Sequence, residues 1–133
     1  MKKSIIALAL AASASLAGAG EVVVHTGSVH FGPGTEDLNN FNPGLGYDFG
    51  PYQLGGFYNS YELPSFYAAW KLPVTDRISF GLGAITGYTW DSDEHHIAGK
   101  RNGVIPLVAV NFRVTRHIGL TYFGQAINLE VRF

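Results

Sequence analysis

The strongest constraint on the fold is a period-two alternation of apolar and polar residues, which is clearest at the C-terminus. Residues 127–133 place Ile, Leu, Val and Phe on one face of an extended chain and Asn, Glu and Arg on the other. Successive side chains of a strand point to opposite sides, so this pattern predicts a β-strand with one apolar face. The same alternation runs through residues 65–72, 78–90 and 117–122, and less regularly through 21–31, 44–50, 51–60 and 103–114.

These eight segments predict an all-β fold, and the composition indicates its surroundings. Only 14% of the residues are charged, whereas a soluble domain has about 25%. After residue 19 no apolar run is long enough for a membrane helix, and a closed barrel is the other structure that satisfies its backbone in lipid. We therefore expect residues 20–133 to form one domain, an eight-stranded antiparallel transmembrane β-barrel of the outer-membrane type. The final aromatic, Phe133, resembles the last residue of such barrels; a soluble sheet is the alternative.

The N-terminal segment has the three parts of a secretory signal. Lys2 and Lys3 form a basic start, an apolar run follows over residues 5–16, and Ala17-Gly18-Ala19 is a small-residue cleavage site. We interpret residues 1–19 as a signal peptide that exports the chain to a Gram-negative type of outer membrane. A membrane anchor is the alternative, but the apolar run is shorter than the roughly 20 residues that a span needs.

Loop lengths predict the orientation of the barrel. Short turns are expected at residues 50–51, 73–76 and 115–116, and longer loops at 32–43, 60–64 and 91–103, with a tight connection near Gly124. Outer-membrane barrels have short periplasmic turns and longer external loops, so both termini are expected in the periplasm. Outward aromatics should then lie near the two membrane interfaces; the candidates are Trp70, Tyr88, Trp90 and Phe133.

The residues predicted to face inward differ between the two ends of the barrel. Near the turns they are charged, and buried charges must pair, so we expect a salt-bridged floor made by Asp48, Lys71, Arg113, Glu130 and Arg132. Nearer the loops they are small or apolar, which would leave a slot for a hydrocarbon chain; these are Gly81, Gly83, Gly87, Ala109, Ile105 and Leu107. The alternative is that the interior is simply filled by Phe57, Tyr67, Ile85 and Phe123.

Several function classes are excluded or left open by single features. With no cysteine and a net charge of -1, the chain has neither a disulfide framework nor the basic surplus of a nucleic-acid-binding protein.

The loop at 91–103 contains Asp91, Asp93, Glu94, His95 and His96. These could bind a cation, or the neighbouring Lys100 and Arg101 could contact phosphates, but a solvated loop tip is the ordinary interpretation. Pro106 marks either a gap in the barrel wall or the start of a strand.

Three polar residues are expected at the same external rim. His30 ends one upward strand, and Asn59 and Ser60 end another. A serine hydroxyl becomes a useful nucleophile when a base accepts its proton, and imidazole is the usual base near neutral pH. We therefore treat His30 as the candidate base, Ser60 as its hydroxyl partner and Asn59 as a polar group that orients His30 or stabilises an oxyanion.

The order of these features resembles the outer-membrane lipid A palmitoyltransferase (PagP) family over most of the mature chain. The matching segments are Val29–Phe31, Asn40–Tyr47, Gly56–Tyr61, Phe80–Gly87, Val104–Leu107 and Leu129–Phe133. The resemblance implies an acyltransferase that moves an acyl chain from a phospholipid to lipid A. Acyl transfer between esters and hydroxyls needs no cofactor, and we expect a monomer without a bound metal. The resemblance also implies essential roles for His30, Asn59 and Ser60.

The resemblance further implies an acyl pocket near Gly81 and Gly83 and a lateral gate at Pro106 and less securely at Pro43. Two departures stand out. The family has Asp where this chain has Asn59, and it carries an N-terminal amphipathic helix for which this chain has no room. A compact, non-enzymatic surface barrel that acts in protection, adhesion or receptor masking is therefore the alternative function.

Overall fold

The computed structural model describes residues 20–32, 34–88 and 103–133. These ranges contain β1 (Glu21–His30), β2 (Phe41–Phe49), β3 (Tyr52–Tyr58), β4 (Pro64–Pro73), β5 (Ile78–Thr86), β6 (Val104–Arg113), β7 (Ile118–Phe123) and β8 (Ala126–Arg132). The predicted signal peptide, Trp90 and residues 91–102 of the histidine-containing loop lie outside the described residues. No helix in the described ranges is long and apolar enough to cross a membrane.

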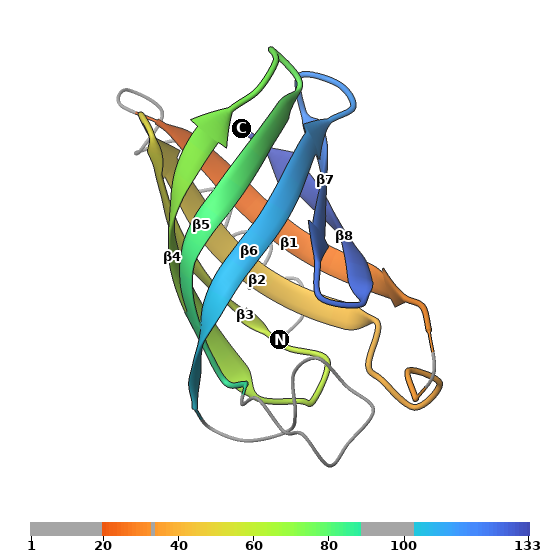
Figure 1. Ribbon diagram of the computed structural model, residues 1–133. Coiled ribbons are helices and arrows are strands. Elements are labelled where there is room, and N and C mark those ends of the chain that lie inside the picture. Colours follow the sequence, from red (N-terminus) through yellow and green to blue (C-terminus); the bar gives the residue numbers. More distant parts are fainter. Residues whose placement is uncertain (1–19, 33, 89–102) are drawn as a thin grey trace, which may run out of the picture.

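The strands form a closed barrel in which each strand is antiparallel to both neighbours (Figure 1). Strand β8 returns to β1, where Ala126 pairs with His30 and Arg132 with Val23. Closure gives every strand two neighbours and so removes the exposed sheet edge. The predicted all-β, eight-stranded antiparallel barrel is confirmed.

The two ends of the barrel differ as the loop lengths predict. The turn end carries the connections at residues 50–51, 74–77 and 114–117 together with the chain end at Phe133. The loop end carries the ends of the strands that precede and follow the other four connections, from β1 to β2, β3 to β4, β5 to β6 and β7 to β8. In Figure 1 the turn end is at the top and the loop end at the bottom.

The alternation of side chains separates an apolar outer surface from a mixed interior. Large apolar side chains outside the barrel are exposed on several strands, including Leu54, Phe66, Trp70, Val108 and Leu129. Inside, one buried cluster consists of Tyr67, Ala69, Ile85, Tyr88, Ile105, Leu107 and Ala109. Phe57, Tyr61 and Phe123 pack against this cluster.

Tyr88 departs from its predicted outward position. Strand β5 ends at Thr86, and Gly87 has a φ of +83°, a left-handed conformation that glycine adopts without strain. This change in the backbone interrupts the alternation, and Tyr88 turns inward, where only 7% of it is exposed. Trp70 and Phe133 are exposed as predicted.

The barrel wall is lower at the β7–β8 hairpin than along β5 and β6, and Figure 1 shows β6 extending beyond β7 toward the loop end. The β5–β6 ladder reaches Thr86–Val104, whereas the β6–β7 ladder stops at Ala109–Phe123. We call this region, beside residues 104–108 of β6, the notch.

Pro106 lies on the edge of the notch. The bonds from Gly87 N to Gly103 O and from Arg113 N to Arg77 O show that odd-numbered residues of β6 bond to β5. Even-numbered residues, Pro106 among them, therefore direct their backbone groups toward the β7 side. Its missing N–H thus falls where the β6–β7 ladder has already ended. Pro106 is the third residue of β6 rather than its first.

Candidate active site

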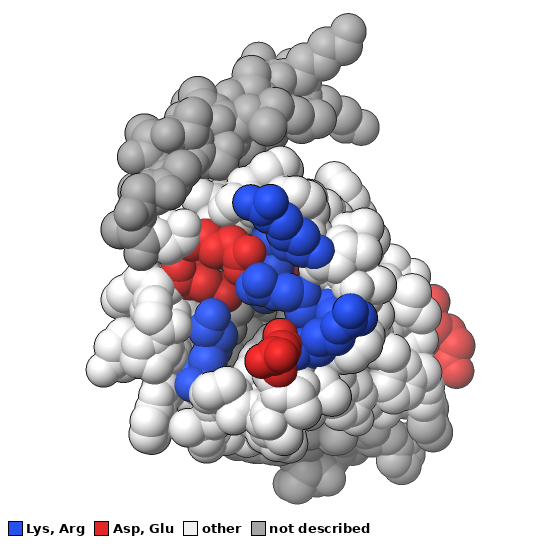
Figure 2. Space-filling model, turned by 90° about the horizontal axis from the view of Figure 1, so that it is seen from above, with Lys and Arg blue, Asp and Glu red and all other residues white. Residues whose placement is uncertain are grey.

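A layer of paired charges closes the interior near the turn end, as predicted. The pairs join Glu21, Asp48, Lys71, Arg113, Glu130 and Arg132. Arg132 is central because its guanidinium donates to Asp48 and Glu130 at 2.7 Å each and to Glu21 at 3.1 Å. Figure 2, which looks onto this end, shows acidic and basic side chains gathered around the barrel opening. We call this group the charged layer.

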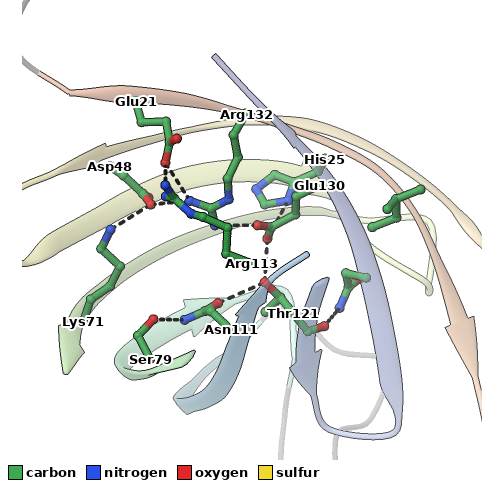
Figure 3. Close-up of polar contacts among 12 residues, drawn as sticks. Glu21, His25, Asp48, Lys71, Ser79, Asn111, Arg113, Thr121, Glu130 and Arg132 are labelled. Atoms are coloured by element: carbon green, nitrogen blue, oxygen red, sulfur yellow. Dashed lines mark hydrogen bonds and ion pairs between the residues drawn. The ribbon is translucent and has the colours of Figure 1, made fainter. Parts of the chain in front are cut away.

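A network of hydrogen bonds continues from the charged layer toward the middle of the barrel (Figure 3). The Thr121 hydroxyl donates to Glu130 at 2.8 Å and lies 2.9 Å from Asn111 Oδ1. His25 Nδ1 is 3.6 Å from Glu130, and His25 Nε2 is 2.8 Å from the Tyr67 hydroxyl. His25 and Tyr67 thus form a polar bridge across the interior, which we call the His25–Tyr67 bridge.

Between this bridge and the loop end lies a cavity of about 100 Å³. Its floor includes His25, Tyr67, Thr121 and Glu130. Its walls are largely apolar and include Leu38, Phe57, Tyr61, Ile85, Tyr88, Leu107, Phe123 and Ala126. Both interpretations of the interior are therefore partly right: Phe57, Tyr67, Ile85 and Phe123 fill much of the space, and a small cavity remains beside them.

The aromatic wall is held together by edge-to-face contacts. The Tyr88 ring packs against Tyr61 and Phe123, with centroids 6.0 and 5.8 Å apart. Burial, and to a lesser extent the nearby Tyr61, raises the pKa of Tyr88. The phenol therefore stays neutral, which suits a largely apolar cavity wall.

His30, Ser60 and Asn40 form a chain of hydrogen bonds at the cavity mouth. Ser60 Oγ lies 2.6 Å from His30 Nε2, and His30 Nδ1 lies 2.7 Å from Asn40 Oδ1. Asn40 Oδ1 is an amide oxygen and can only accept a hydrogen bond. His30 Nδ1 is therefore the donor and carries the imidazole proton. Nε2 is then left to accept the Ser60 hydroxyl proton. This is the arrangement of a serine, a base and an orienting group found in acyl-transfer enzymes.

Backbone bonds between loops bring these three residues together. His30 ends β1, and Asn40 lies directly before β2. The Asn40 carbonyl accepts from Ser28 N–H at 2.9 Å, and the Ser60 carbonyl accepts from Asn39 N–H at 3.1 Å. The β1–β2 loop is thereby tied to both β1 and the β3–β4 loop.

Asn59 does not take the predicted orienting role, because its side chain points away from His30 into a separate set of bonds. Asn59 is 0% exposed. Its Oδ1 accepts from Tyr61 N–H and Leu63 N–H, at 2.9 and 3.0 Å. Its Nδ2 donates to Ser65 Oγ at 2.9 Å and to the Gly87 carbonyl at 3.1 Å. Asn59 therefore shapes the turn that carries Ser60.

The expected glycine-lined slot is not where the cavity lies. Neither Gly81 nor Gly83 lines the cavity. A Cβ on Gly83 would lie 1.9 Å from the Ala68 carbonyl oxygen, so this glycine permits β4 to approach β5 closely. Residues of all eight strands line the cavity, and β5 contributes Ile85 rather than a glycine.

The other predicted acyl-contacting residues are divided between core, cavity and wall. Leu107 lines the cavity, Ile105 is buried in the core cluster, and Pro106 is exposed at the notch. In the described residues, no group of three or more His, Cys, Asp or Glu side chains is arranged to hold a metal ion.

Sequence reasoning missed Asn40 and the His25–Tyr67 bridge. An Asn-Asn pair just before a strand is an ordinary turn signal, and nothing in its spacing points to His30. The chain matches no protein-family model and no curated protein sequence.

Proposed function

We propose that this protein is an outer-membrane acyltransferase that moves an acyl chain from a phospholipid to lipid A, as the family it resembles does. One observation carries the proposal: the Asn40–His30–Ser60 chain of hydrogen bonds stands at the mouth of a cavity with apolar walls. A nucleophile, its base and a pocket for a hydrocarbon chain are the three parts that an acyl-transfer site needs.

The outer surface supports a membrane location. Exposed apolar side chains surround a closed barrel whose interior holds paired charges. That distribution is the reverse of a soluble barrel and is typical of barrels with lipid outside. The predicted signal peptide supports export. The loop end, with Ser60, would face outward, where lipid A lies.

In the proposed reaction, the acyl group passes first from the donor to Ser60 and then from Ser60 to lipid A. Ser60 Oγ attacks the ester carbonyl of the donor while its proton passes to His30 Nε2, and the bond to the donor alcohol breaks as that alcohol takes the proton from His30. The acyl group is then an ester of Ser60. A lipid A hydroxyl then attacks this ester and gives its proton to His30. The bond between the acyl carbon and Ser60 Oγ breaks, and Oγ takes the proton back from His30 to restore the hydroxyl. Asn40 orients His30 throughout and receives no proton.

The notch supports entry of a lipid donor from the side. Residues 104–108 of β6 have no ladder partner on β7, so the wall is interrupted beside the cavity residues Leu107 and Phe123. A phospholipid could reach Ser60 there while its remaining chain stays in the membrane.

The test combines covalent labelling with lipid analysis. A fluorophosphonate should label Ser60 in the wild-type barrel but not in Ser60→Ala, and only slowly in His30→Ala. Ser79→Ala and His117→Ala, at the turn end, are the matched controls. Mass spectra of lipid A from expressing cells should show an added acyl chain that both active-site variants abolish. Unchanged lipid A beside a correctly inserted barrel would instead favour the surface-protection or adhesion function.

A further inference from the structure

The cavity has a polar floor, and this bears on which acyl groups it accepts. Its walls are largely apolar, but the polar residues His25, Gln53, Tyr67 and Glu130 line its far end. His25 is fixed there on both sides, by the Tyr67 hydroxyl at 2.8 Å and by Glu130 at 3.6 Å. Glu130 is in turn bonded to Arg132 at 2.7 Å (Figure 3). The floor is thus the edge of an extended polar network rather than one movable side chain.

The distance from the mouth to this floor follows from the strand geometry. His30 and His25 are five positions apart on β1, but an irregularity between His25 and Gly27 makes this stretch match only four residues of β8, from Ala126 to Glu130. It therefore spans roughly 13 Å along a strand and about 10 Å along the axis of a tilted barrel. An extended chain of single bonds advances about 1.2 Å per bond, as the polypeptide backbone does. The floor is therefore about eight bonds below the rim.

The cavity is also small, at about 100 Å³, and the polar groups of the floor belong to its lining. A longer chain would have to break the His25–Tyr67 bridge and press hydrocarbon against Glu130 and Arg132, leaving buried polar groups without partners.

We propose that this site selects short and medium acyl chains, of at most about eight to ten carbons, because the His25–Tyr67 bridge closes the cavity. This inference rests on the proposed function of Ser60, and it names the acyl group that the same site takes. Selectivity is set at the floor, by residues remote from the hydroxyl that carries the acyl group.

Chain-length profiles of the purified full barrel in detergent micelles test it. The substrates are p-nitrophenyl butanoate, octanoate, decanoate, dodecanoate and hexadecanoate. We expect kcat/KM for the octanoyl and decanoyl esters to exceed that for the hexadecanoyl ester by at least roughly tenfold. His25→Ala opens the floor and should reduce this ratio to below about threefold. Leu54→Ala, which removes an exposed outward side chain from β3, should leave the ratio unchanged.

A binding measurement separates the two proposals. Native mass spectrometry of Ser60→Ala with decanoate and with hexadecanoate measures chain length without catalysis, and decanoate should be retained preferentially. Preference for hexadecanoate in either experiment, or a ratio unaffected by His25→Ala, overturns the inference on chain length. If decanoate is retained selectively but no ester is turned over, the acyltransferase proposal fails while the length limit of the cavity stands.

Discussion

Asn40 Oδ1 lies 2.7 Å from His30 Nδ1, on the opposite side of the imidazole from Ser60. The two residues are ten positions apart and belong to different ends of one loop. This contact selects the ring proton position that leaves Nε2 able to accept from Ser60.

Replacement of Asn40 by Ala should lower kcat without removing it. The lost hydrogen bond to His30 is worth about 0.5–1.5 kcal/mol, so we expect labelling and turnover to fall by roughly twofold to twelvefold. Asn40→Asp retains an acceptor for Nδ1 and should keep more activity than Asn40→Ala. Asp37→Ala, at an exposed position of the same loop, is the control. Equal rates for Asn40→Ala and wild type would show that Asn40 does not assist His30.

Asn59→Asp should weaken the barrel and should not raise activity. The change removes the two donors to Ser65 Oγ and the Gly87 carbonyl and places a carboxylate against that carbonyl oxygen. We expect a loss of about 1–3 kcal/mol in the free energy of unfolding, measured by thermal or urea unfolding in micelles. Asn39→Asp, at a partly exposed position, serves for comparison. An increase in acyl transfer with unchanged stability would show that the family's Asp is preferred here after all.

Arg132→Met should be the most destabilising single change in the charged layer. It leaves Asp48 and Glu130, which are 4% and 2% exposed, without their shared cation. Breaking a buried pair in this way costs about 3–5 kcal/mol, seen as a lower denaturation midpoint. Arg116→Met, at an exposed site of a turn, should have little effect. Similar stability in the two variants would mean that Lys71 and Arg113 compensate fully for the lost charge of Arg132.

Two glycines of β5 should respond in opposite ways to alanine. A Cβ at Gly83 would meet the Ala68 carbonyl oxygen at 1.9 Å and Ala69 Cα at 2.6 Å, and this backbone cannot move freely within the sheet. Gly83→Ala should therefore cost about 1–3 kcal/mol. At Gly81 the nearest atom would be 3.5 Å away, an ordinary contact, so Gly81→Ala should fold normally.

The same glycine pair tests the position of the acyl pocket. Since neither residue lines the cavity, Gly81→Ala should leave the chain-length profile of the esterase reaction unchanged. A shift of that profile toward shorter chains would mean that acyl groups lie beside Gly81.

Much of the fold follows from local pattern. Alternation at residues 127–133 predicts β8, and the repeated pattern predicts the barrel, because burial of one face of a strand depends mainly on period and turn position. The spacing of 30 positions between His30 and Ser60 predicts that the two side chains are close only because both strands run toward the same rim. The inward position of Tyr88 was not predictable in this way, since it depends on the left-handed conformation of Gly87.

The sequence by itself determined the all-β barrel, its long and short connections, the paired charges near the turn end and the placing of His30 and Ser60 at one rim. Only the tertiary structure decided that Asn40 rather than Asn59 bonds to His30, and that Ile85 rather than Gly81 or Gly83 is the part of β5 that lines the cavity. The physical reason is that alternation specifies the face on which a side chain lies. Hydrogen-bond partners and empty space instead depend on register, loop closure and the packing of residues far apart in the chain.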